Sequence, residues 1–260
     1  MGLFDFLKKK VSPEELKDGD VMQAESLQER GADATKDAAA VAGIQPADTP
    51  LQPGSRYVFG QWNGRSLVWR VLKVADGQAL MVTQDCLEVK PYHYRVGETS
   101  WSECTLRGEL NGDYFYRNPK VFSAKDRSAV MLTTNENRSV SFQNKRTFEE
   151  FYSKGCDPTE DRVFLLSIGE VIDYFKVDGE SEFPDSMGYV AFKFPSGRDA
   201  IANIDGRPKP WWLRQPGRNR STATVVTADG MINFNGFTAT QCVPAVRPAL
   251  WLNLKIVVGG

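Results

Sequence analysis

Arginine and asparagine side chains lie close together near the C-terminal end of the chain, where they could bind an anionic or polar ligand. Arg214, Arg218 and Arg220 supply guanidinium groups, and Asn219 supplies an amide between them. Guanidinium groups bind carboxylates and phosphates through paired hydrogen bonds. The alternative is a structural role in which such donors bind loop carbonyls, and this is what we expect for Arg247 at the final strand.

Further candidates lie on strands that flank this segment. Asn233 and Asn235 share one face of an expected strand, and Phe234 points to the other face. Trp211 and Trp212 point to opposite faces of another strand, so only one of them can be core if one face is solvated. The predicted ligand-binding residues are Trp212, Arg214, Arg218, Asn219, Arg220, Asn233, Asn235 and Thr238. The alternative is a buried aromatic scaffold beside a solvated hairpin.

The sequence does not contain the common patterns of catalytic and cofactor sites. It has no G-x-S-x-G motif, no P-loop and no G-x-G-x-x-G motif. His93 is the only histidine, and Cys86, Cys104, Cys156 and Cys242 form no C-x-x-C pair. A structural zinc site needs about four close ligands, so this set disfavours one. We therefore predict a non-enzymatic protein with no metal, no cofactor and reduced, half-buried cysteines.

Composition restricts the class of protein further. Of 260 residues, 41% are apolar, which is enough for a packed core. Lys and Arg total 32 against 33 Asp and Glu, and this balance argues against nucleic acid as a partner. No apolar run is long enough for a transmembrane helix, and the first lysines follow the apolar residues instead of preceding them, unlike a secretory signal. We predict a cytoplasmic protein.

The chain divides by composition into four segments. Residues 1–23 predict a short helical segment, 24–52 a flexible linker, 53–255 a folded domain and 256–260 a tail. The linker prediction rests on few large apolar residues among Ala, Asp, Gln and Gly. The first segment carries the apolar residues Leu3, Phe4, Phe6 and Leu7. It either docks weakly onto a membrane or a partner groove, or packs on its own domain.

Strands are expected where the folded domain begins. Residues 56–60, 67–72 and 78–83 have the composition of strands, and Asn63-Gly64 and Asp76-Gly77 separate them. Asn-Gly and Asp-Gly pairs favour tight hairpin turns because both residues readily adopt a positive φ. Residues 56–83 are therefore predicted to form an antiparallel meander of three strands.

Helices are expected in the middle of the domain. Cap residues predict helices over 104–110, 123–132 and 168–175, the last beginning with a Ser-x-x-Glu capping box. Residues 163–166 predict a short buried strand, and 176–210 are rich in Gly and Pro and predict loops.

The C-terminal part returns to strands. A hairpin is expected from 223–227 and 231–235 around Asp229-Gly230, followed by a last strand over 246–252. Strands at both ends, helices between them and long loops indicate an α+β domain whose terminal strands pair.

Five blocks, in this order, resemble an uncharacterised bacterial domain family over about residues 53–254. They are Trp69–Leu72, Cys104–Asn111, Phe164–Ser167, Trp211–Gly217 and Val246–Leu252. That family is similar to the C-type-lectin-like fold of formylglycine-generating enzymes and of the variable proteins of diversity-generating retroelements. The resemblance implies a C-type-lectin-like domain. In the variable proteins, the residues before the final strand form a ligand-binding face, which corresponds here to Arg214–Thr240.

The sequence departs from these relatives at their functional positions. It lacks the Glu-Pro-Asn, Gln-Pro-Asp and Trp-Asn-Asp motifs of calcium-dependent sugar sites. Formylglycine-generating enzymes use two late cysteines, whereas only Cys242 stands there in this chain. We therefore expect a module that binds an as yet unidentified protein or small molecule. The alternatives are an oxidase that uses Cys242, or an assembly protein docked through its N-terminal helix.

Overall fold

The computed structural model describes residues 50–143, 150–175, 181–182, 189–192 and 199–258. The chain separates into two compact units, 1–42 and 43–260, and the described residues all belong to the second. The predicted N-terminal helical segment and the predicted linker up to residue 49 lie outside the described residues. The described residues are mostly antiparallel strands with few and short helices, which fits a small α+β or mainly β domain.

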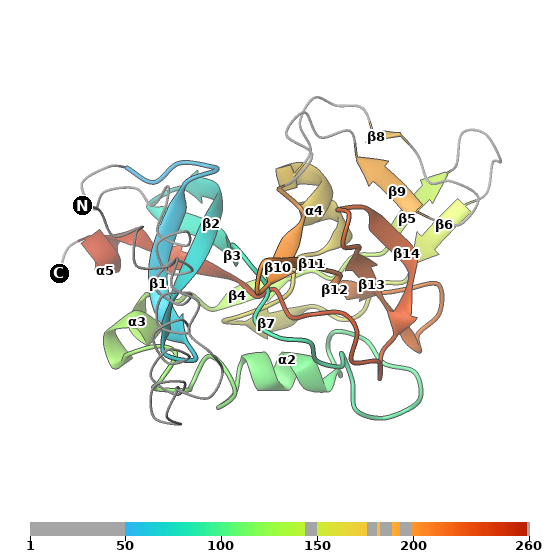
Figure 1. Cartoon of the computed structure of the whole chain (residues 1–260), viewed down its shortest axis with the longest axis horizontal. Helices are drawn as coiled ribbons and strands as arrows, with labels where there is room; N and C mark the ends of the chain where they lie inside the picture. Colours follow the sequence, from blue (N-terminus) through green and yellow to red (C-terminus); the bar gives the residue numbers. More distant parts are fainter. Residues whose placement is uncertain (1–49, 144–149, 176–180, 183–188, 193–198, 259–260) are drawn as a thin grey trace, which may run out of the picture. The chain divides into compact units, whose positions relative to one another are not determined.

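The predicted meander is present as three adjacent antiparallel strands (Figure 1). They are β1 (Arg56–Trp62), β2 (Arg65–Ala75) and β3 (Gln78–Thr83). The turns follow from their dipeptides: φ is 51° and 78° at Asn63-Gly64, and 54° and 74° at Asp76-Gly77. Two positive φ angles in a row match the twist of the flanking strands, so both hairpins close tightly.

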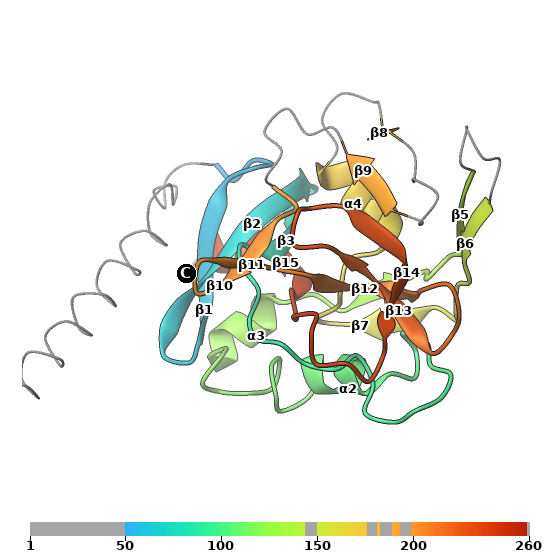
Figure 2. The same cartoon turned by 45° about the vertical axis from the view of Figure 1, so that its right-hand side comes forward.

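The two ends of the folded domain meet in one sheet. Strand β15 (Ala249–Asn253) pairs with β3 in the order β1-β2-β3-β15, and Leu250 lies opposite Met81 (Figure 2). The predicted pairing of terminal strands is therefore confirmed. The last strand begins at Ala249 and not at residue 246. Val246 bonds instead to Glu88, outside the sheet.

A second sheet of five strands has the order β12-β13-β14-β9-β8. Its strands are β12 (Trp211–Pro216), β13 (Thr222–Val226), β14 (Ile232–Thr238), β9 (Tyr189–Phe192) and β8 (Ser181–Glu182). The antiparallel hairpin of β13 and β14 confirms the prediction for 223–235.

Sequence reasoning missed several short strands. The prediction of loops over 176–210 is wrong, because this segment contains β8, β9 and a hairpin of β10 (Ala202–Ile204) and β11 (Arg207–Lys209). That hairpin turns at Asp205-Gly206, with φ of 51° and 74°, the same turn chemistry as in the meander. The strand predicted over 163–166 is reduced to one bridge between Phe164 and Ala249.

Two further strand pairs lie in a region for which no elements were predicted. Strand β4 (Thr133–Asn135) pairs with β7 (Thr159–Asp161), and β5 (Val140–Gln143) pairs with β6 (Glu150–Ser153). Figure 2 shows the β5–β6 hairpin to the side of β14, where β6 and β14 are in contact.

The helices are α2 (Thr105–Leu110), α3 (Ala124–Ala129), α4 (Ile168–Phe175) and α5 (Leu254–Val258). The capping box of α4 is confirmed, since Glu170 N donates to Ser167 Oγ at 3.0 Å and Ser167 N donates to Glu170 Oε2 at 2.7 Å. Helix α3 is shorter than predicted because Val130 is extended and bridges Leu252. Helix α5 includes residues 256–258, so the predicted tail is partly helical.

Strand β12 is buried on both faces, which corrects the expectation of one solvated face. Trp211 and Trp212 are both fully buried. Trp211 packs against Phe175 of α4, with ring centroids 6.4 Å apart, while Trp212 packs against Tyr92 at 5.7 Å. The edge of the strand is covered too, because Trp212 N donates to Ala245 O at 3.1 Å.

The bend in β14 depends on Gly236. Its φ is +71°, and a Cβ there would lie 2.2 Å from Ala223 O on β13. We expect Gly236→Ala to lower the free energy of unfolding by more than about 2 kcal/mol, from backbone strain plus steric overlap. Gly64→Ala is the matched control, since φ there is +78° but nothing lies within 4 Å. If urea unfolding shows the same loss of stability for Gly236→Ala and Gly64→Ala, the close approach of Gly236 to β13 is unimportant.

Candidate functional site

Hydrogen bonds of the backbone and of the Asn219 side chain span the β12–β13 loop, residues 217–221. Gly217 N donates to Thr222 O at 2.8 Å, and the Asn219 side chain accepts from Ser221 N at 3.0 Å. Gly217 is required, because a Cβ there would lie 2.4 Å from Asn235 O. This loop therefore presents a fixed surface beside the end of the β13–β14 hairpin.

Three of the predicted ligand-binding residues are structural. Trp212 is fully buried, and its Nε1 donates to Lys90 O at 2.7 Å. Arg214 is also buried, and its Nη1 donates to Glu170 Oε2 at 2.7 Å and to Leu165 O at 2.9 Å. The ligand-binding prediction for these two residues is corrected: they hold β12 to its neighbours and do not reach the surface.

Asn233 is the third of the predicted ligand-binding residues that has a structural role. Its side chain is buried and accepts from Gly236 N at 3.2 Å, so it stabilises the bend in β14. Asn235 is half-buried and Thr238 is exposed, and Arg218 N donates to Asn235 O at 3.2 Å. The loop and the hairpin end therefore lie side by side.

The predicted residues that remain accessible are Arg218, Asn219, Arg220, Asn235 and Thr238. Arg218 and Asn219 are exposed and Arg220 is half-buried. Of these residues, Arg220 also lines a cavity. It connects the predicted surface to a pocket that the sequence did not reveal.

This cavity, which we call the polar pocket, has a volume of about 370 Å³. Residues of three loops and Arg220 line the polar pocket, and nearly all of these residues are polar or charged. The lining residues are Ser100, Ser102, Glu103, Glu136, Asn137, Arg138, Ser139, Lys154, Gly155, Cys156, Asp157 and Arg220. The loops precede α2, join β4 to β5, and join β6 to β7.

Backbone hydrogen bonds join the loops around the polar pocket. Thr99 N donates to Arg220 O at 2.8 Å, which fixes the loop before α2 to the β12–β13 loop. Cys156 N donates to Asn137 O at 3.1 Å, which joins the other two loops. A Cβ at Gly155 would lie 2.3 Å from Asn137 O, so only glycine permits this approach. The pocket is thus formed by ordered backbone.

The charges of the polar pocket are balanced but only partly paired. Arg138 and Glu136 form an ion pair at 3.8 Å, and both side chains are mostly exposed, so the pair adds little stability. Glu103 accepts from Ser100 Oγ at 3.3 Å. In the described part of the chain, no ion-pair partner is present for Arg220 or Lys154. These two cations are therefore available to an anionic group.

The four cysteines differ in burial, and none of them forms a disulfide. All four are free, and Cys242 is exposed. Burial raises the pKa of Cys86 and of Cys104 to about 12, so both are protonated thiols at neutral pH. Within the described ranges, no group of three or more His, Cys, Asp or Glu could hold a metal ion.

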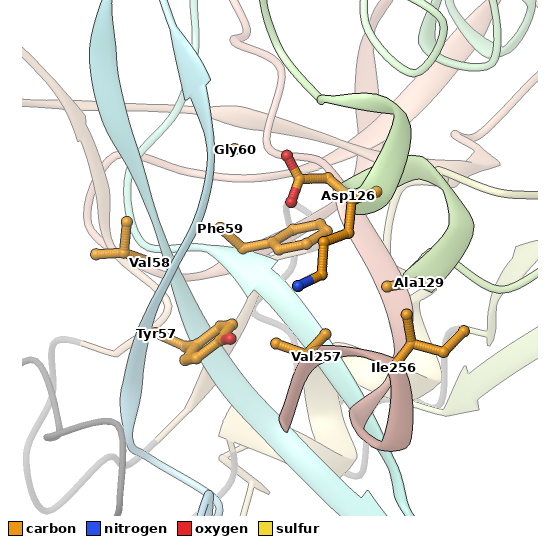
Figure 3. Close-up of a pocket in the computed structure, with 9 residues that line it drawn as sticks. Tyr57, Val58, Phe59, Gly60, Asp126, Ala129, Ile256 and Val257 are labelled. Carbon is orange, nitrogen blue, oxygen red and sulfur yellow. The ribbon is translucent and has the colours of Figure 1, made fainter. Parts of the chain in front are cut away.

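A second pocket, of about 210 Å³, lies between β1, α3 and α5. Figure 3 shows Tyr57 on β1 with Ile256 and Val257 of α5 nearby, and Asp126 on α3 across the pocket. Burial, and to a lesser degree the Asp126 carboxylate, raises the pKa of Tyr57. Apolar side chains, together with Lys125 and Asp126, line this second pocket.

Sequence reasoning missed the three loops of the polar pocket. Their only signal was local: polar runs such as Asn135–Ser139 and Lys154–Asp157, each of which reads as an ordinary loop. Nothing in the spacing of these runs shows that they converge on Arg220. Concerning membranes, none of the described helices has the length and apolar character needed to cross a bilayer.

Comparison with protein families gives one match. The model of a family described as "Domain of unknown function (DUF6273)" matches residues 76–254. The chain therefore belongs to this family, and the matched range contains every lining residue of the polar pocket. Comparisons with curated proteins and with solved structures give no match.

Proposed function

We propose that this protein is a binding module that recognises a polar ligand in the polar pocket and on the adjoining β12–β13 loop. The observation that carries the proposal is the convergence of three separate loops and Arg220 on one cavity with an almost wholly polar lining. Loops held by a rigid scaffold are a common origin of binding sites. Arg218 and Thr238, exposed beside the pocket, extend the surface that a ligand can contact.

A small ligand fits this site better than a flat protein interface. The volume of about 370 Å³ lies within the usual range of small-molecule pockets. A protein partner could still insert one side chain or a chain end into the pocket, in which case the same residues would make the contact.

We further propose that the domain has a C-type-lectin-like fold. Support comes from the pairing of the last strand with the N-terminal meander and from short helices between the terminal strands. The β13–β14 hairpin and the preceding loop would then occupy the place of the ligand-binding face in retroelement variable proteins. Superposition of an experimental structure on such a protein tests this, and a different strand order in the sheets would contradict it.

The binding proposal predicts ligand-dependent stabilisation that requires Arg220. We expect at least one compound in a library of polar metabolites, sugars and short peptides to raise the Tm of the full chain, because a ligand that binds only the folded state stabilises it. Arg220→Ala should abolish most of this shift, since a guanidinium contact to a charged ligand contributes about 1.5–3 kcal/mol. Thermal unfolding followed by dye fluorescence measures both.

Arg207→Ala is the matched control, because Arg207 is exposed on β11 and does not line the polar pocket. This variant should keep the full ligand-dependent shift. The proposal is contradicted if no compound stabilises the chain, or if both variants respond to the ligand alike.

A further inference from the structure

Two of the four cysteines belong to loops that line the polar pocket. Cys156 is half-buried and lines the pocket itself. Cys104 is only 4% exposed and directly follows Ser102 and Glu103, which line the same pocket. Both are free thiols; Cys104 belongs to the hydrophobic core cluster, and Cys156 packs against that cluster. One thiol is therefore part of the lining, and a second is one residue away from it along the chain.

Hydrogen bonds hold the loops of these two cysteines against the same strand, β7. In the loop before α2, Trp101 Nε1 donates to Asp161 Oδ2 at 2.9 Å. In the β6–β7 loop, Cys156 N donates to Asn137 O at 3.1 Å, and Asn137 Nδ2 donates to Thr159 Oγ1 at 3.1 Å. Thr159 Oγ1 in turn donates to the same Asp161 Oδ2 atom at 2.7 Å. One carboxylate oxygen therefore connects the two loops and fixes them relative to each other.

The buried hydroxyl of Tyr92 lies close to both thiols. Burial raises the pKa of Tyr92 well above its usual value, and the Cys104 and Cys156 thiols raise it further. Neighbouring charges have such an effect mainly from within about 4–6 Å. Both sulfur atoms therefore lie near one hydroxyl, in agreement with the hydrogen bonds that connect their loops.

We propose that oxidation by a peroxide joins Cys104 and Cys156 in a disulfide that links two walls of the polar pocket. Hydrogen peroxide first oxidises the Cys156 thiol to a sulfenic acid and releases one water. The Cys104 thiol then condenses with the sulfenic acid, so that the S–S bond forms and a second water leaves. In total the two thiols lose two electrons and two protons, and the peroxide is reduced to two waters. This step goes beyond the proposed function, because it needs no ligand in the pocket.

Burial decides which of the two thiols meets the oxidant first. Cys156 lines an open pocket, so a small peroxide reaches its sulfur. Cys104 is buried, and its burial raises the pKa to about 12, so this thiol is protonated and shielded at neutral pH. Arg107 N donates to Cys104 Sγ at 3.4 Å, which holds that sulfur at the start of α2. Cys156 is therefore the thiol that is oxidised, and Cys104 is the resolving thiol.

Mass spectrometry of the full chain after treatment with hydrogen peroxide tests the proposal. We expect a loss of two hydrogen atoms and, after proteolysis without reductant, a cross-linked peptide that contains Cys104 and Cys156. The bond closes a loop of about fifty residues, so it restricts the unfolded chain and should raise the Tm by about 5 °C. Dithiothreitol should restore both the original mass and the original Tm.

Cysteine variants separate the two steps of the reaction. Serine is itself a good N-cap residue, so Cys104→Ser keeps the cap of α2 and should fold. In this variant peroxide should leave a sulfenic acid at Cys156, which dimedone labels. Cys242→Ser is the matched control, because Cys242 is exposed and does not line the polar pocket. The control should form the Cys104–Cys156 cross-link as the parent chain does.

The proposal is wrong if the oxidised parent chain contains no peptide that links Cys104 to Cys156. Oxidation of Cys156 only to the sulfinic acid, or a bond between Cys156 and Cys242, would give that result. A cross-link without a rise in Tm would contradict the link between two ordered walls of the pocket. None of these measurements needs a ligand, so failure of this proposal and failure of the proposed function are distinguishable.

Discussion

Replacing Asp161 with alanine is expected to lower the free energy of unfolding by about 3 kcal/mol. Asp161 is fully buried, and its carboxylate accepts from Arg107 Nε at 2.6 Å, Trp101 Nε1 at 2.9 Å, Asn135 Nδ2 at 2.9 Å and Thr159 Oγ1 at 2.7 Å. Removing it leaves several donors without a partner at once. The Arg107 side chain is 28% exposed, so water offsets part of the loss, which places the effect at the lower end for a broken buried ion pair.

Glu160→Ala is the control for this prediction. Glu160 is the exposed neighbour of Asp161 on β7, and its loss should change stability by less than about 0.5 kcal/mol. Urea unfolding of both variants gives the comparison. A loss below about 1 kcal/mol for Asp161→Ala would mean that solvent reaches the carboxylate and that the four contacts do not act together.

The same substitution should weaken ligand binding, although Asp161 does not line the polar pocket. Trp101 belongs to the loop before α2, Asn135 precedes the β4–β5 loop, and Thr159 follows the β6–β7 loop. One carboxylate therefore anchors all three loops that form the pocket. We expect Asp161→Ala to abolish ligand binding at temperatures at which the chain is still folded, and with it the ligand-dependent rise in Tm.

Replacing Arg247 with methionine is expected to lower the free energy of unfolding by about 3 kcal/mol. Arg247 is fully buried, and its guanidinium donates to Thr83 O at 2.9 Å, Gln84 O at 3.1 Å and Ala200 O at 3.2 Å. Burial lowers its pKa to about 10, so it remains charged at neutral pH. The variant leaves the Thr83 and Gln84 carbonyls unpaired, at about 1–3 kcal/mol each.

A lysine at position 247 should not maintain the free energy of unfolding of the parent chain. The guanidinium carbon lies 4.9 Å from the Trp211 ring centroid and 5.4 Å from the Phe175 ring centroid, so the cation lies over both rings while it reaches three carbonyls. A lysine ammonium has no planar fork with which to make these contacts together. Arg247→Lys should therefore remain less stable than the parent by more than about 1 kcal/mol.

Arg95→Met serves as the surface control for both Arg247 variants. Arg95 is exposed, and its loss should have little effect in urea unfolding. Full stability of Arg247→Lys would show that charge alone matters at this position. Stability of Arg247→Met equal to that of the parent would show that the three carbonyls find other partners, which would contradict the structural role expected for Arg247 from the sequence.

Local chemistry was sufficient wherever an element depends on residues next to one another. Asn63-Gly64 and Asp76-Gly77 set the two turns of the meander, because their own side chains permit positive φ. Ser167 and Glu170 begin α4 through hydrogen bonds that span only one turn. The pairing of β15 with the N-terminal meander was also predicted correctly, since strands at both ends of a domain with helices between them favour one shared sheet.

The sequence by itself thus determined the meander, the start of α4, the β13–β14 hairpin and the structural role of Arg247. It could not place the binding surface. Trp212 and Arg214 look like surface candidates until Tyr92 and Glu170, distant in sequence, cover them. Only the tertiary structure brings Asn137, Cys156 and Arg220 to one polar pocket. Which loops meet depends on packing between segments that are distant in sequence, and local composition does not predict that packing.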